Sequence, residues 1–256
     1  MMSYLKWAFG SSIKSFGYVR VKHVTYNADG LVVAGKSAEF LSSARFRKAY
    51  RRGMDSGHMI GGEYNRDLHI EWRVAICCWA GRHASLLPGD FAECGVNTGI
   101  YSLAVCDYVD FNALDKSFYL FDTFRGIPEL QMSAGEKRDR LISNTKYPDV
   151  FEHAAKNFAP FPRAKLVRGT VPDTLTSVAI DKVAYLSLDM NIAYPERKAI
   201  EYFWPRLAPG AVVVLDDYGW SGYEEQKKTM DEFARQVGVE VWMLPTGQGL
   251  MFKPCH

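Results

Sequence analysis

The chain has 256 residues, 48% of them hydrophobic, which is enough apolar sequence for one large domain with a smaller appendage. Its formal net charge of +2 is nearly neutral and its basic run, RFRKAYRR, is typical of a solvated helix face, so we expect no nucleic-acid partner. The five cysteines have no metal-ligand spacing, and the N-terminus lacks an apolar stretch for a secretory leader or membrane span, which predicts a cytoplasmic protein with reduced thiols.

The first 54 residues are predicted to form an appendage, ahead of a main domain over residues 55–256. Apolar and polar residues alternate from Phe16 to Val33 around the turn residues Asn27 to Gly30, which indicates a β-hairpin. Apolar side chains at helical spacing follow, and Gly53 is expected to end that helix.

Two segments lead from the appendage to the first strand of the main domain. The glycine-rich DSGHMIGGEY, residues 55–64, is typical of a mobile loop that closes over a ligand, or of a plain connection between helices. A packing helix is then predicted from about Asn65 to Leu87.

DFAECGVNTG, from Asp90 to Gly99, is predicted to be an apolar strand that turns tightly into a helix. Gly95 and Gly99 would let a ligand lie against the backbone, and the first helical turn offers unpaired N–H groups. The spacing E-x-G-x-x-x-G differs from the dinucleotide fingerprint, which favours S-adenosylmethionine over a nicotinamide dinucleotide. The alternative is an ordinary strand-to-helix turn.

Further strands and helices alternate to the end of the chain. SFYLFD ends on Asp122, at the position where a doubly wound sheet usually holds ribose hydroxyls. AKLVRG, VAYLSLD and AVVVLDD are the next strands, with helices from Val150, from Pro195 and after Asp217, and VEVWMLP and GLMFKP pair last. The pattern predicts an α/β fold with a doubly wound, mostly parallel, seven-stranded sheet and ligands at its carboxyl edge.

Acidic residues stand at the ends of several of these strands. Asp189 ends one strand, and Asp216 with Asp217 ends the next. Because neighbouring strands lie about 4.8 Å apart, these carboxylates could share one cation, and magnesium would relieve their mutual repulsion. A substrate hydroxyl bound to that ion would become more acidic and point at the cofactor. Alternatively, Asp216 and Asp217 cap a turn and Asp189 lines a water-filled cleft.

The motifs together resemble the macrocin O-methyltransferase family of class I, S-adenosylmethionine-dependent enzymes. The resemblance runs from about His58 to the C-terminus and rests on HMIG, GDFAECGVNTG, FDTFRGIP, LVRGTVPDTL, LSLD and LAPGAVVVLDDYG. It implies a Rossmann-like domain that methylates sugar hydroxyls with the help of magnesium. The cofactor-binding residues that it implies are Met59, Ile60, Glu93, Gly95, Thr98, Asp122, Thr123, Gly169 and Thr170, and the metal ligands are Asp189, Asp216 and Asp217.

One position departs from the family pattern. The family usually has a second acid two residues beyond the first metal ligand, Asp189, and that acid is often proposed as the general base; here the position is Asn191. A neutral amide cannot take a proton. Either metal coordination acidifies the hydroxyl enough, or another group such as a histidine serves, or activity is reduced or directed at another acceptor.

The leading hypothesis is therefore a magnesium-assisted O-methyltransferase acting on a sugar of a natural product or surface polysaccharide. The acceptor would be a small molecule or a glycan, and a catechol-like phenol would suit the same metal site. The other hypotheses are a non-catalytic S-adenosylmethionine-binding protein and, disfavoured by the glycine spacing, a nicotinamide-dependent oxidoreductase. A homo-oligomer is left open.

Overall fold

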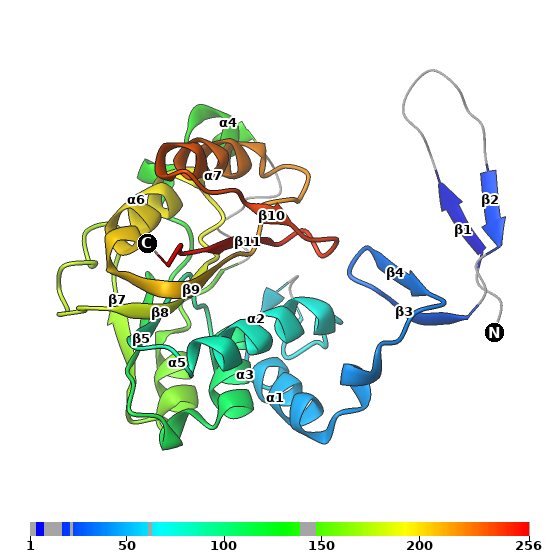
Figure 1. The fold of residues 1–256 in the computed structure, drawn as a ribbon, viewed down its shortest axis with the longest axis horizontal. Helices are drawn as coiled ribbons and strands as arrows, with labels where there is room; N and C mark the ends of the chain where they lie inside the picture. The colour runs from blue at the N-terminus through cyan, green and yellow to red at the C-terminus, as the bar shows by residue number, and fades with distance from the viewer. Residues whose placement is uncertain (1–3, 8–16, 21–22, 61–62, 139–146, 256) are drawn as a thin grey trace.

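The computed structural model describes residues 4–7, 17–20, 23–60, 63–138 and 147–255, and a seven-stranded sheet lies at its centre (Figure 1). The strand order is β10-β11-β9-β8-β5-β6-β7. Strands β5 to β9 pair in parallel, whereas β11 is antiparallel to β9 and β10. This confirms the predicted doubly wound, mostly parallel sheet. The strands are β5 (Asp90–Cys94), β6 (Phe118–Asp122), β7 (Ala164–Arg168), β8 (Val183–Leu188), β9 (Leu207–Leu215), β10 (Trp242–Met243) and β11 (Gly249–Phe252).

Helices cover both faces of the sheet, because successive strand residues point to opposite sides. On β5, Phe91 packs in one hydrophobic cluster and Ala92 in the other; on β6, Leu120 and Phe121 divide in the same way. One face is covered by α1 (Ala44–Met54), α2 (Glu71–Ala84), α3 (Ile100–Val109) and α5 (Phe151–Phe158), and the other by α6 (Ala193–Phe203) and α7 (Glu224–Val237). Short elements are α4 (Ala134–Arg138), η1 (Glu39–Ser42), η3 (Phe111–Ala113), η4 (Glu129–Gln131) and η6 (Trp204–Arg206).

The described residues of the N-terminal part form two antiparallel strand pairs. The predicted turn between Asn27 and Gly30 is confirmed, and it joins β3 (Val24–Ala28) to β4 (Leu31–Ala34). The preceding strand, β2 (Gly17–Arg20), pairs with β1 (Tyr4–Trp7) and does not extend that hairpin as predicted. Tyr26 of β3 holds the hairpin to the start of α2, because its hydroxyl donates to the His69 carbonyl and to Glu71 Oε2, both at 2.9 Å.

Two predicted helix boundaries are wrong. Gly53 does not end α1; it lies in the last turn, where a Cβ would sit 2.3 Å from the Ile100 carbonyl oxygen, so this glycine permits the close approach of α3. The helix predicted from Asn65 begins only at Glu71. Asn65 and His69 both have φ near +52°, and the His69 N–H donates to Asp67 Oδ1 within a turn, so the backbone before Glu71 is not helical.

The strand register brings the carboxyl ends of four strands to one level. Cys94 of β5 is opposite Phe121 of β6 and Leu188 of β8, and Leu188 is opposite Leu215 of β9. The residues that follow these strand positions therefore emerge at the same edge of the sheet. None of the helices in the described part of the chain has the length and apolar character that a membrane crossing requires.

Candidate functional site

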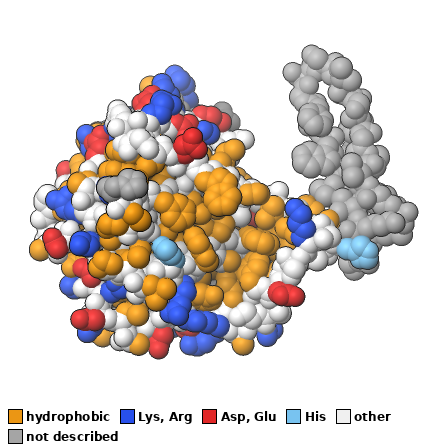
Figure 2. All heavy atoms as spheres, in the orientation of Figure 1, with side chains coloured by type: hydrophobic (Ala, Val, Ile, Leu, Met, Phe, Trp, Pro, Cys, Tyr) orange, Lys and Arg blue, Asp and Glu red, His pale blue; other side chains and the backbone are white. Residues whose placement is uncertain are grey.

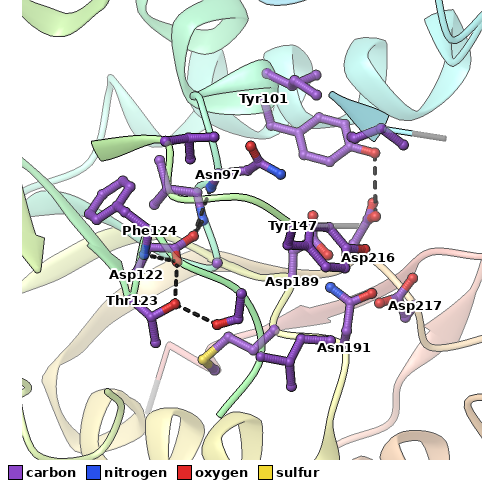
Figure 3. Close-up of a pocket in the computed structure, with 18 of the residues that line it drawn as sticks. Asn97, Tyr101, Asp122, Thr123, Phe124, Tyr147, Asp189, Asn191, Asp216 and Asp217 are labelled. Atoms are coloured by element: carbon purple, nitrogen blue, oxygen red, sulfur yellow. Dashed lines mark hydrogen bonds between the residues drawn. The ribbon is translucent and has the colours of Figure 1, made fainter. Parts of the chain in front are cut away.

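A cavity of about 390 Å³ opens at this carboxyl edge (Figure 3). Its lining includes Gly95 after β5, Asp122 at the end of β6, Asp189 after β8 and the pair Asp216 and Asp217 after β9. The sequence predicted that acids at these strand ends would meet, and the structure brings them around one cavity.

Gly95 makes the approach between the loops after β5 and β8 possible. Its φ is +89°, and a Cβ there would lie 1.8 Å from the Asp189 carbonyl oxygen. Gly99, at φ +101°, leaves room for the Phe158 ring, which a Cβ would meet at 2.6 Å. The space that we expected these glycines to leave for a ligand is therefore filled by protein, although Gly95 still lines the cavity.

Asp122 organises the loop after β5. Its Oδ2 accepts the N–H groups of Val96 at 2.6 Å and Asn97 at 2.7 Å, and its Oδ1 accepts the Phe124 N–H at 2.7 Å. Thr123 turns its hydroxyl to the Gly126 carbonyl at 2.6 Å. In Figure 3, Asp122 and Thr123 form one side of the cavity and the three other acids lie across from them.

The remaining cofactor residues implied by the resemblance divide into two groups. Ile60 and Gly169 line the cavity. The lining does not include Met59, Glu93, Thr98 or Thr170. Thr98 Oγ1 lies 2.7 Å from Ser56 Oγ, and Thr170 donates to Asp173 Oδ2 at 2.6 Å, so both hydroxyls are engaged within the protein.

Glu93 lies beneath the loop rather than in the cavity. It is 1% exposed, and its Oε2 has no hydrogen-bond partner among the described residues. Burial raises the pKa of this carboxyl well above its usual range. A buried acid with an oxygen that lacks a partner favours the protonated form, which can donate a hydrogen bond.

The three carboxylates after β8 and β9 form a cluster. Asp189, Asp216 and Asp217 each offer an oxygen, and these oxygens all lie within 4.8 Å of one another. Burial, followed by the charge of Asp216, raises the pKa of Asp217 to about 7 and that of Asp189 well above its usual range. Asp217 Oδ2 is buried and has no partner in the described part of the chain.

Asp216 has partners that the sequence did not predict. Arg73 of α2 donates to both of its oxygens, from Nε at 3.3 Å and from Nη2. Tyr101 donates to Oδ2 at 3.3 Å and Gln248 to Oδ1 at 3.0 Å. Arg73 lies on a helix whose apolar periodicity predicts only a packing element. The sequence therefore contains no signal that Arg73 reaches the acidic cluster.

Asn191, the departure from the family pattern, lines the cavity beside the cluster. Its φ is +63°, and its Oδ1 accepts the Tyr223 hydroxyl at 3.3 Å. Burial raises the pKa values of Tyr223 and of the neighbouring cavity residue Tyr147. Both phenols are therefore donors at neutral pH rather than bases.

A second group of ligand-type side chains lies outside the cavity. Asp67, His69 and Glu71 offer atoms within 4.8 Å of one another. Tyr50 donates to Asp67 at 2.5 Å and Tyr26 to Glu71 at 2.9 Å. These acids hold the hairpin and α1 to the start of α2, which accounts for the cluster without an ion.

Comparison with known proteins identifies the family. The family model described as macrocin-O-methyltransferase (TylF) matches residues 76–244, more than half of the chain. The chain belongs to the macrocin O-methyltransferase family. The match excludes Asp29, Ile60 and Arg73, so these parts of the cavity wall lie outside the shared segment.

Comparison of this macrocin O-methyltransferase family member with individual proteins and a solved structure also finds O-methyltransferases. The chain is 29% identical over 142 residues to 8-demethyl-8-(2,3-dimethoxy-alpha-L-rhamnosyl)-tetracenomycin-C 4'-O-methyltransferase of Streptomyces olivaceus, covering 52% of this chain and 54% of the relative. It is 23% identical over 144 residues to mycinamicin III 3''-O-methyltransferase of Micromonospora griseorubida, covering 52% and 56%. The chain thus spans about half the length of the curated relatives it matches. The solved O-methyltransferase NovP has the same fold, with a TM-score of 0.69 at 18% identity over 82% of this chain and 98% of NovP.

Proposed function

We propose that the protein is an S-adenosylmethionine-dependent, magnesium-assisted O-methyltransferase that acts on a hydroxyl of a sugar in the cytoplasm. The observation that carries the proposal is the convergence of Asp189, Asp216 and Asp217 on one cavity with Gly95 and Asp122. Family membership supports methyl transfer to oxygen, and the names of the tetracenomycin and mycinamicin relatives support a natural-product sugar as acceptor.

The cofactor would lie on the β5–β6 side of the cavity. Asp122 and Thr123 are the candidates for its ribose, Gly169 for its adenine and Ile60, with Met59 beside it, for a cover. Glu93 and Thr98 would act from beneath the loop by fixing its shape, and Thr170 by fixing the turn at Gly169. S-adenosylmethionine bound here would supply the methyl group that is transferred.

The acids fit a hard divalent cation. Magnesium prefers carboxylate oxygens, and Asp217 Oδ2 is a buried acceptor to which no described residue donates. Asp189 is also open, because no described residue donates to its carboxylate. Asp216 is the third ligand only if one of its donors moves. Magnesium held by these residues would act as a Lewis acid and make a bound hydroxyl more acidic.

The chain's own groups must place the acceptor and receive its proton. With S-adenosylmethionine as the methyl donor, the acceptor oxygen would gain the methyl group and its hydroxyl proton would have to pass to a group of the protein or to solvent. Asn191 cannot receive that proton, and Tyr223 and Tyr147 are already protonated. Carboxylate oxygens of Asp189 and Asp217 that the ion does not engage would be the proton acceptors within the cluster.

A second candidate is a cofactor-binding protein without turnover. Asn191 in place of an acid and the Arg73 guanidinium on Asp216 both favour it. Turnover separates the two candidates. The purified chain would be incubated with S-adenosylmethionine, magnesium and a panel of glycosides, nucleotide sugars and catechols, and the demethylated cofactor and methylated product measured by mass spectrometry.

The outcome of that assay decides between the candidates. Our proposal predicts product with a sugar acceptor, lost on chelation and restored by magnesium. Cofactor binding in a calorimeter without turnover on any acceptor would favour the non-catalytic protein. Methylation of the catechol alone would move the acceptor to the phenol class, and full turnover under chelation would contradict the role of magnesium.

A further inference from the structure

Arg73 lies between two acids that come from different parts of the chain. One is Asp216, at the end of β9, which receives hydrogen bonds from Arg73 Nε and Nη2. The other is Asp29, in the turn of the β3–β4 hairpin, whose Oδ1 is 3.9 Å from Arg73 Nη1. The side chains of Arg73 and Asp29 are each 15% exposed and that of Asp216 is 3% exposed, so solvent screens these interactions only weakly.

Asp216 has no acceptor position to spare. A carboxylate has about four lone-pair sites, and Arg73 occupies two of them, Tyr101 one and Gln248 one. A cation that binds Asp216 must therefore displace a donor. Tyr101 and Gln248 are neutral, whereas Arg73 carries a positive charge that would repel the incoming ion. Arg73 is thus the donor whose departure a cation favours most.

Asp29 is placed to receive the departing guanidinium. No described residue donates a hydrogen bond to its side chain, and Arg73 is the cation that faces it. The rings of Tyr101 and Trp220, with centroids 5.8 Å and 5.5 Å from Arg73 Cζ, lie beside the guanidinium. Both Arg73 and Asp29 line the cavity.

We propose that Arg73 is a positioning residue that passes from Asp216 to Asp29 when a divalent cation binds between Asp189, Asp216 and Asp217. Without the ion, Arg73 supplies the positive charge that the buried acids need. With the ion, Arg73 pairs with Asp29 in the hairpin turn that lines the cavity, so that the N-terminal part of the chain responds to the occupancy of the site. The inference rests on the proposed function, because it requires that the cluster binds a cation.

The test is a double-mutant cycle on manganese affinity, measured by calorimetry on the full chain without acceptor. Asp29→Asn removes the second partner of Arg73, and we expect it to weaken manganese binding several-fold. Arg73→Met removes the competing charge, and we expect it to tighten binding several-fold. In the Arg73→Met background, Asp29→Asn should have no further effect on manganese affinity, because there is no guanidinium left to pair with Asp29.

Two further variants separate this role from a general effect of charge or folding. Arg163→Met removes an arginine that is not in the cavity lining and that pairs with Asp115 at 2.9 Å, and it should leave manganese affinity unchanged. Arg73→Lys keeps the charge and should retain the effect of Asp29→Asn. Circular dichroism of each metal-free variant identifies those that are folded.

Each outcome bears on the inference. Equal effects of Asp29→Asn on manganese affinity in both backgrounds, or no effect in the native chain, would contradict the movement of Arg73 from Asp216 to Asp29. Such a result would leave the proposed metal site intact. A native chain that binds no manganese would overturn the metal part of the proposed function and the inference with it. Weaker rather than tighter binding by a folded Arg73→Met variant would also overturn it.

Discussion

Gly95 and Asp189 meet where β5 and β8 leave the sheet, and no side chain fits between them. A Cβ on Gly95 would lie 1.8 Å from the Asp189 carbonyl oxygen and 2.4 Å from its carbonyl carbon. The contact fixes the position of Asp189, one of the three clustered acids, relative to the loop after β5, whose N–H groups donate to Asp122. The two sides of the cavity are thereby joined through backbone.

Replacing Gly95 should therefore damage both stability and metal binding. Gly95→Ala adds the clash with Asp189 to the strain of a positive φ, and we expect a loss of about 3 kcal/mol or more in the free energy of unfolding. Gly238→Ala is a matched control, because Gly238 has φ +72° and nothing within 4 Å of its Cβ position. It should cost about 1 to 2 kcal/mol and leave manganese affinity unchanged. Equal losses in the two variants, measured by denaturant unfolding, would contradict the role of the contact.

Asp217 should be needed for turnover and not for cofactor binding. Its Oδ2 has no donor among the described residues, whereas the proposed cofactor residues lie across the cavity. We expect Asp217→Ala to abolish methyl transfer and to leave the affinity for S-adenosylmethionine within a few-fold, as measured by calorimetry. Asp149→Asn, which removes an exposed acid paired with Arg168, is the control for lost charge. Wild-type turnover by Asp217→Ala would exclude Asp217 as an essential ligand.

Metal binding should strengthen as the pH rises. Burial raises the pKa of Asp217 from 3.8 to about 7, so the metal-free protein holds a proton there that the ion must displace. In the metal-free protein the same shift lowers the free energy of unfolding as pH rises from about 4 to about 7, because the folded state binds the proton more tightly. The gain in melting temperature from magnesium should therefore be larger at pH 8 than at pH 6. A gain independent of pH, with no proton release in calorimetry, would mean that the cluster is already ionised.

Restoring an acid at position 191 should raise turnover. Asn191→Asp would place a carboxylate where the Tyr223 hydroxyl now donates at 3.3 Å, and a positioned base contributes about a hundredfold or more in many enzymes. We expect kcat to rise at least tenfold. The pH dependence of kcat should also show a new group, the carboxyl at position 191, that must be deprotonated for activity. Asn97→Asp, at another amide that lines the cavity, is the control. An unchanged kcat would indicate that the metal alone acidifies the acceptor.

The sequence predicted the strand ends well, for a physical reason. Parallel strands bring their carboxyl ends to one edge, so Asp122, Asp189 and Asp216 had to meet once their strands were assigned. Buried strands such as VAYLSL are apolar on both faces, which made that assignment direct. The family resemblance was confirmed over residues 76–244. The division of the chain at residue 54 stays a prediction.

Contacts between distant segments could not be predicted in the same way. The helical pattern of α2 shows that one face packs, but not that Arg73 on it reaches Asp216, 143 positions away. Glycines carry a similar ambiguity, because the sequence shows that a side chain is absent and not whether a ligand or the Asp189 backbone fills the space. Thr98 was assigned to the cofactor from its place in a motif, yet its hydroxyl faces Ser56.

The most direct test of the account is the anomalous scattering of manganese in crystals grown with the demethylated cofactor. The account predicts one peak within coordination distance of carboxylate oxygens from Asp189, Asp216 and Asp217, with the sulfur of the cofactor facing the same cavity. A peak elsewhere, or the cofactor bound in the cavity with no peak at these three residues, would contradict the proposal that they hold the ion that activates the acceptor.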